Sequence, residues 1–163
     1  MNFSAKQLRT ACFTGHRNMR LPYNIIERRV VDEVEGLIGA GYRYFGAGGA
    51  RGFDALASEV VLALKKKHPD IHLILVLPFD NQYEHERGWS QAEIEQYHDL
   101  KDRASKVTII APEYRSGIYY QRNRHLVDYS SACIAYMTHD RSGTGYTVNC
   151  AKRKGLRIIN VAD

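Results

Sequence analysis

A strand, a glycine-rich turn, a helix and a second strand are expected in succession within residues 42–77, which read YRYFGAGGARGFDALASEVVLALKKKHPDIHLILVL. Apolar residues fill the start of this stretch and return as a nearly continuous run in 71–77, a pattern typical of strands that are covered on both faces. Between these two segments Leu56, Val60 and Leu64 recur at helical spacing. The order predicts two parallel strands joined by a crossover helix.

The same alternation continues through the rest of the chain. Strands are expected at residues 10–14, 42–47, 71–77, 107–111, 132–137 and 156–161. Helices are expected at residues 24–40, 54–68, 121–129 and 146–154, with one more that follows a polar and aromatic stretch and ends near residue 104. Alternating strands and helices predict an α/β fold of the Rossmann-like type, a three-layer sandwich with a mostly parallel sheet of about six strands.

Length and charge narrow the class of protein. A chain of 163 residues suits a single domain over 1–163 that buries a full core. Its net charge of +5 favours anionic partners without separating nucleic acid from a small phosphate ligand. The longest strongly apolar run, 73–79, is too short to span a membrane. No signal peptide is visible, and Cys12, Cys133 and Cys150 lack metal-type spacing, so free thiols in a reducing cytoplasm are expected.

Residues that suit anion binding follow four of the expected strands. They lie in the segments 15–17, 46–54, 78–80 and 139–145, which are rich in glycine, arginine, serine and threonine. In open α/β sheets ligands bind beyond the carboxyl ends of the strands. We therefore expect these turns to meet at one rim of the molecule and to hold an anion there.

The glycine-rich loop 46–52 connects a strand to a helix. Glycine lets the backbone approach an anion closely, and free amides at a helix start point towards it. Arg51 suits a bidentate phosphate contact. The loop fits neither the Walker motif nor the dinucleotide fingerprint, and a simple tight turn is the alternative. Asp54 is either the N-cap of the following helix or a functional carboxylate that binds a ribose hydroxyl or acts on a glycosidic bond.

Three further segments have two interpretations each. In 15–17, Arg17 suits a phosphate clamp and His16 a phosphate donor or proton shuttle, unless this is a plain surface loop. Ser142, Gly143 and Thr144 offer hydroxyls and a helix N-terminus, or a simple helix cap. Arg122-Asn123-Arg124 is expected to open or precede a helix, where arginine is unfavourable unless an anion is near.

The aromatic residues Tyr83, Trp89 and Tyr97 have two interpretations as well. They either pack in the core, which is the commoner role of such side chains, or cover a base from a lid.

With these motifs the chain resembles the SLOG superfamily of Rossmann-like proteins, and within it the YpsA-like branch. The resemblance rests on residues 12–17, 46–57, 75–79 and 122–124 and covers nearly the whole chain. Some members of the superfamily are thought to sense nucleotide-derived signals. The resemblance therefore implies a SLOG-type domain that binds such a ligand.

Two better-understood groups share some of these motifs. DprA-type proteins, which bind single-stranded DNA, have counterparts of 15–17, 49–57, 122–124 and 142–144. Lonely Guy-type phosphoribohydrolases share the GGxxG loop and cleave the N-glycosidic bond of nucleoside monophosphates. Thr147 stands where their catalytic glutamate belongs. The first relationship implies nucleic-acid binding, and the second implies a hydrolase whose key carboxylate is missing here.

The leading hypothesis is that the sheet edge binds a nucleotide or a nucleotide-derived phosphate ligand, including one derived from NAD. Single-stranded nucleic-acid binding and a nucleotide N-glycosidase or hydrolase with Asp54 as its catalytic residue are the alternatives, so whether the chain is an enzyme stays open. No metal, resident cofactor or membrane partner is expected, and small domains of this kind commonly form homodimers. The expected ligand-binding residues are Thr14, Gly15, His16, Arg17, Gly48, Gly49, Arg51, Gly52, Asp80, Arg122, Asn123, Ser142, Gly143 and Thr144.

Overall fold

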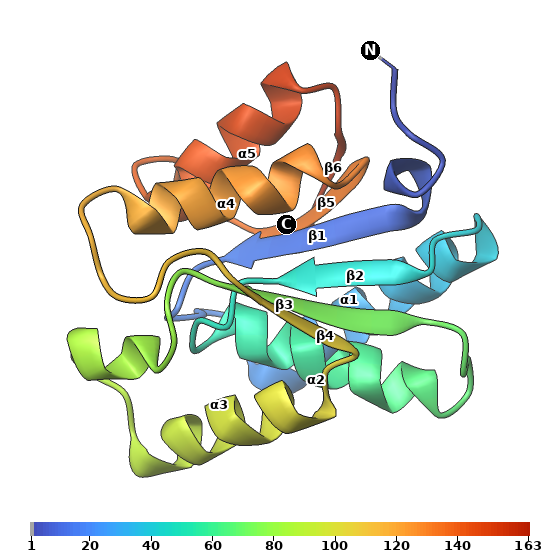
Figure 1. Ribbon diagram of the computed structural model, residues 1–163. Coiled ribbons are helices and arrows are strands. Elements are labelled where there is room, and N and C mark those ends of the chain that lie inside the picture. The colour runs from blue at the N-terminus through green and yellow to red at the C-terminus, as the bar shows by residue number, and fades with distance from the viewer. Residues whose placement is uncertain (1) are drawn as a thin grey trace.

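A computed structural model describes residues 2–163, in which six strands alternate with five α-helices (Figure 1). The strands are β1 (Thr10–Gly15), β2 (Tyr44–Ala47), β3 (His72–Leu77), β4 (Lys106–Ile109), β5 (Ala132–Tyr136) and β6 (Arg157–Asn160). The helices are α1 (Tyr23–Gly39), α2 (Phe53–Lys65), α3 (Gln91–Arg103), α4 (Ile118–Asp128) and α5 (Gly143–Arg153), with short 3-10 helices η1 (Gln7–Arg9) and η2 (Gln82–His85). The predicted Rossmann-like α/β sandwich is confirmed.

All six strands pair in parallel, in the order β4-β3-β2-β1-β5-β6. Helices α1, α2 and α3 cover one face of the sheet, and α4 and α5 cover the other (Figure 1). From β1 the chain proceeds towards β4 on one side and later returns to β5 on the other side. The junction of β1 and β5 is therefore the topological switch point, where open α/β sheets place their ligands.

Alternate residues of each central strand enter the two layers of core. Phe13 and Leu75 pack beneath α1 and α2, whereas Cys12, Val76 and Cys133 pack beneath α4 and α5. Successive side chains of a strand point to opposite faces, and both faces are covered here, which explains the continuous apolar runs in the sequence. The three cysteines are free, as predicted, and the structure shows that all of them are buried. No helix among residues 2–163 is long and apolar enough to cross a bilayer.

Two helices begin three residues earlier than their apolar periodicity indicates. Helix α4 begins at Ile118, after Gly117 with a positive φ of 80°. Residues 122–124 therefore lie in its second turn and do not open it, so the argument from the helix N-terminus was wrong for them. Helix α5 begins at Gly143, because the Ser142 side chain caps it by accepting a hydrogen bond from the Gly145 amide at 3.0 Å. The first turn of α5 begins with Gly143, Thr144 and Gly145, which give no apolar signal. In α4 the first turn begins with the buried Ile118, but the next residue on the same helix face is Arg122, which interrupts the apolar period.

The aromatic residues before and within α3 form a packed cluster. The ring centroids of Tyr83 and Tyr97 lie 5.4 Å apart, and those of Tyr83 and Trp89 lie 5.9 Å apart. Tyr97 is buried, and the other two are half-buried against the core beneath α1 and α2. Their role as core side chains is confirmed.

The loop after β1 is tied to the end of β5 by one buried hydroxyl. Tyr136 is completely buried, and its hydroxyl accepts hydrogen bonds from the amides of Arg20 at 3.0 Å and Leu21 at 3.3 Å. A buried amide without a partner costs free energy. Tyr136 thereby fixes the path of the loop that carries Arg17.

We predict that Tyr136→Phe lowers the free energy of unfolding by about 1–3 kcal/mol, because it leaves two amides without an acceptor. Tyr129→Phe is the matched control, since Tyr129 is 64% exposed and its change is expected to have almost no effect. Urea unfolding measures both. Equal stability of Tyr136→Phe and the wild type would contradict the role of this hydroxyl.

Candidate functional site

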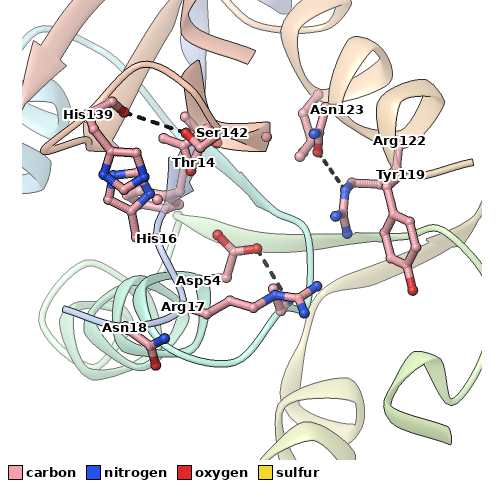
Figure 2. A pocket seen from close by; sticks show the side chains of 16 residues that line it. Thr14, His16, Arg17, Asn18, Asp54, Tyr119, Arg122, Asn123, His139 and Ser142 are labelled. Carbon is pink, nitrogen blue, oxygen red and sulfur yellow. Dashed lines mark hydrogen bonds between the residues drawn. The ribbon is translucent and has the colours of Figure 1, made fainter. Parts of the chain in front are cut away.

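A cavity of about 430 Å³ opens beyond the carboxyl ends of β1 and β5, at the switch point (Figure 2). Four segments form it: the turn after β1, the start of α2, the first turns of α4 and the turn into α5. Its size lies within the usual range of small-molecule sites. The lining residues are Phe13, Thr14, Gly15, His16, Arg17, Asn18, Ala50, Asp54, Tyr119, Arg122, Asn123, Leu126, His139, Ser142, Gly143 and Thr144.

Most of the expected site residues meet here although they are far apart in the sequence. Those that line the cavity are Thr14, Gly15, His16, Arg17, Asp54, Arg122, Asn123, Ser142, Gly143 and Thr144. Gly48, Gly49, Arg51, Gly52 and Asp80 do not line it. The turns after β1, β2 and β5 thus share one rim, whereas the residue expected after β3 lies elsewhere.

Asp54 is a buried carboxyl group at the base of the cavity, with 7% of its surface exposed. It is not the N-cap of α2, as one interpretation held, because the helix is preceded by Gly52 and begins at Phe53. Its carboxylate instead accepts a hydrogen bond from the Ala50 amide at 3.3 Å. Burial raises the pKa of Asp54, and the nearby Arg122, the Ala50 amide and Arg17 oppose this rise. Such a carboxyl group suits hydrogen bonding or proton exchange with a ligand.

Arg122 is a buried cation, only 6% exposed, on the cavity side of α4. Its Nη1 donates to the Gly48 carbonyl, and its Nε donates to Asn123 Oδ1 at 2.7 Å. Burial lowers the pKa of Arg122, and the Asp54 carboxylate works against this effect. An arginine keeps its charge in proteins, so the cavity wall holds a fixed positive group.

Gly48 makes the approach of these two charged groups possible. A Cβ at this position would lie 2.7 Å from Arg122 Nη1 and 3.0 Å from Asp54 Oδ2. The glycine therefore supports the site from behind without lining the cavity.

The other glycines of the loop serve packing in the same way. The Gly49 carbonyl accepts a hydrogen bond from Gln82 Nε2 at 2.5 Å. At Gly52, with φ of +82°, a Cβ would lie 2.2 Å from the Arg17 carbonyl oxygen. The expectation that the loop amides cradle a phosphate is therefore not what the geometry shows: of residues 48–52, only Ala50 reaches the cavity.

Two expected binding residues point away from the cavity. Arg51 lines a separate hollow beside α1 and α2, where its Nη1 lies 3.4 Å from Asn18 Oδ1. Asp80 is exposed and pairs with Lys101 of α3. Each of these residues comes after a strand of the sheet, as expected, but its side chain lies outside the cavity.

Arg17 is the accessible cation of the cavity, with 36% of its side chain exposed. Its Nη1 lies 3.0 Å from Oε1 of Glu86, a residue just after η2. Arg17 and Arg122 therefore bring two guanidinium groups to one cavity. In Figure 2, the Arg17 side chain lies between Asp54 and Tyr119.

A stacked histidine pair forms the opposite wall. The rings of His16 and His139 lie 4.2 Å apart at an angle of 9° (Figure 2). His16 Nε2 accepts a hydrogen bond from the Thr138 amide at 3.0 Å, so this ring is neutral with its proton on Nδ1. Burial, the neighbouring His139 and Arg20 all lower the pKa of His16.

The turn into α5 closes the cavity beside the histidines. Gly143 and Thr144 line it at the start of α5, where helix amides favour an anion. Ser142 lines it as well, while also serving as the N-cap. Thr147, at the position of the hydrolase glutamate, is buried and donates to the Gly143 carbonyl at 3.0 Å. It does not line the cavity.

Sequence reasoning missed several residues of the cavity. Tyr119 precedes Arg122 by three positions and shares its helix face, but the expected helix began too late to include it. His139 lies in the expected ligand-binding turn without having been singled out. Glu86, which pairs with Arg17 without lining the cavity itself, lies in a polar segment with no motif. Among residues 2–163 there is no cluster of three or more His, Cys, Asp or Glu side chains suited to a metal.

This fold, with a polar cavity at the switch point of a parallel sheet, defines a Rossmann-like α/β protein. The chain matches the YspA SLOG family, YpsA, over residues 11–157, and it belongs to that family.

Two curated relatives match most of the chain. A UPF0398 protein of Halalkalibacterium halodurans is 30% identical over 143 residues, which cover 86% of this chain and 73% of the relative. The SPbeta prophage-derived protein YoqJ of Bacillus subtilis is 30% identical over 127 residues, 71% of this chain and 72% of YoqJ.

Two solved structures of DNA processing protein A share the fold. The protein from Helicobacter pylori, described with a unique single-stranded DNA binding mode, matches with a TM-score of 0.65 at 18% identity over 94% of this chain. The protein from Streptococcus pneumoniae matches with a TM-score of 0.63 at 15% identity over 93% of this chain. The chain spans 64% and 49% of those two proteins, respectively.

We predict that protonation of His16 makes the folded protein less stable at acid pH. Because its pKa is lowered on folding, the unfolded chain takes up the proton first, and the free energy of unfolding falls as the pH drops below about 6.5. In His16→Asn the contribution of this side chain to the acid-induced decrease in the free energy of unfolding is absent. Urea unfolding at about pH 7.5 and about pH 5.5 measures the difference.

His72 and His125 also have lowered pKa values, and they contribute equally to both proteins. The comparison of wild type and variant therefore isolates His16. An identical pH dependence in the two proteins would rule out a shifted pKa at this residue.

Proposed function

We propose that the cavity binds the phosphate group of a nucleotide or nucleotide-derived ligand, including one derived from NAD. The observation that carries this proposal is the convergence of Arg17, the buried Arg122 and the start of α5 at Gly143 and Thr144 around a single cavity at the switch point. Guanidinium groups and helix N-termini both bind phosphate oxygens well, because they direct N–H donors and positive charge at the anion.

Other groups of the cavity suit the rest of such a ligand. The side-chain oxygen of Asn123 accepts a hydrogen bond from Arg122, so the side-chain amide nitrogen of Asn123 remains a donor for a ligand. Asp54 is an acceptor for a ribose hydroxyl, and the stacked rings of His16 and His139 offer a flat surface to one side of the cavity. The cavity thus combines cationic, polar and flat elements that match phosphate, sugar and base.

We predict that AMP raises the melting temperature of the wild-type protein, because a ligand that binds only the native state stabilises it. Arg17→Ala is expected to weaken the binding by about tenfold or more, since it removes a charged donor. Isothermal titration calorimetry measures this loss.

Arg28→Ala is the matched control, because Arg28 is an exposed arginine of α1 outside the cavity. Arg51→Ala is expected to resemble this control, since Arg51 does not line the cavity either. The proposal fails if no phosphate-bearing nucleotide stabilises the wild type, or if Arg28→Ala weakens binding as much as Arg17→Ala.

A second candidate function is the binding of single-stranded nucleic acid. The fold match to DNA processing protein A favours it, together with an exposed surface next to the cavity that contains Arg115, Tyr120, Arg124 and Tyr146. The rings of Tyr120 and Tyr146 lie 4.6 Å apart, and Arg124 Nη1 donates to the Tyr146 hydroxyl at 3.0 Å. Aromatic rings with arginines between them suit stacked bases and a phosphate backbone.

For this candidate, we predict that a fluorescent oligothymidylate binds at low salt. The slope of log K against log salt concentration is expected to be about −0.7 for each phosphate contacted. Fluorescence anisotropy over a salt series measures the slope, and Arg124→Ala is expected to make it shallower, whereas Arg28→Ala is not. Absence of binding at low salt would remove the candidate.

A further inference from the structure

Glu86 is a buried carboxylate held against the accessible cation of the cavity. Its side chain is 8% exposed, and its Oε1 lies 3.0 Å from Arg17 Nη1. The same oxygen accepts a hydrogen bond from Trp89 Nε1 at 2.8 Å. The ion pair with Arg17 and the hydrogen bond from Trp89 therefore fix the carboxylate in place beside the cavity.

The Glu86 carboxylate also lies against Tyr119, which lines the cavity. Burial, and then a side-chain hydrogen bond with Glu86, raise the pKa of Tyr119, so its hydroxyl stays protonated. Arg17, Trp89 and Tyr119 thus hold the Glu86 carboxylate just behind the cavity wall, where burial weakens the screening by water.

The charges around the cavity can then be counted. Arg17 and Arg122 each contribute one positive charge, and Glu86 cancels that of Arg17. Asp54 either carries one negative charge or is protonated, because burial raises its pKa. His16 is neutral. The groups named here leave at most one net positive charge for the ligand.

A ligand with one phosphate group matches this balance better than a polyphosphate. A terminal phosphate carries about −1.5 to −2 charges at neutral pH, and a phosphodiester carries about one. Every further phosphate in a chain adds negative charge, whereas Arg17 and Arg122 are the only arginine or lysine side chains that line the cavity. The mismatch costs binding free energy.

We propose that Glu86 is a specificity-determining residue, which restricts the cavity to ligands with a single phosphate group and disfavours di- and triphosphates. This proposal rests on the phosphate-binding function proposed above. Glu86 acts through Arg17 and through its own charge, without touching the ligand.

The test compares the affinities of AMP and ATP for the wild type and for Glu86→Gln. Titration calorimetry with EDTA present prevents divalent cations from neutralising ATP. We expect the wild type to bind AMP about tenfold or more tightly than ATP, and Glu86→Gln to reduce this ratio about tenfold. Adenylyl-(3′→5′)-adenosine, which contains one phosphodiester, is the third probe. Tighter binding of this probe than of AMP indicates a diester ligand, and tighter binding of AMP indicates a monoester.

Glu84→Gln is the matched control, because Glu84 is an exposed carboxylate of η2 in the same segment, and it should leave the ratio unchanged. Trp89 is the only tryptophan of the chain and contacts Glu86, so its fluorescence reports whether Glu86→Gln is folded.

The outcomes separate the two proposals. If none of the three probes binds either protein, the phosphate-binding function and this inference both fall. If AMP binds the wild type but ATP binds equally well or better, the inference alone is wrong, whatever the folding of the variant. An effect of Glu84→Gln as large as that of Glu86→Gln also overturns it, because charge anywhere in the segment would then suffice.

Discussion

The buried guanidinium of Arg122 is the group on which the site depends most. It reaches the Gly48 carbonyl from α4, and it lies close to the Asp54 carboxylate because Gly48 has no side chain. Removing one member of such a buried set leaves another charge or polar group unsatisfied, which costs far more than a surface contact. The turn after β2, the start of α2 and the second turn of α4 therefore form one interdependent unit.

Much of the fold could be predicted from the sequence because strand and helix leave different apolar periods. The run at 71–77 and the helical repeat of Leu56, Val60 and Leu64 lie in β3 and α2, as expected. Helix starts were harder, because the first turn of α5 begins with small residues and the apolar period that Ile118 begins in α4 is interrupted at Arg122. Their positions depend on Gly117 and on the Ser142 cap, whose effect is local and conformational.

The site was predictable only at the level of chain segments. Parallel topology brings the ends of β1, β2 and β5 to one edge, so residues 15–17 and 142–144 meet at the cavity. Which way each side chain points was not predictable. Arg51 and Arg17 both follow strands, yet one leaves the cavity and the other enters it. Tertiary partners decide this, and Glu86 has no sequence motif that relates it to Arg17.

Cys12 and Cys133 are register partners on the neighbouring strands β1 and β5, and both are completely buried. A thiol reacts with oxidants only when it is reachable, so these two are protected for as long as β1 and β5 stay paired. Their chemical lifetime is therefore governed by the rate at which the sheet opens, a property of kinetic stability. The strand pair that positions the cavity thus also shields these two thiols from oxidants.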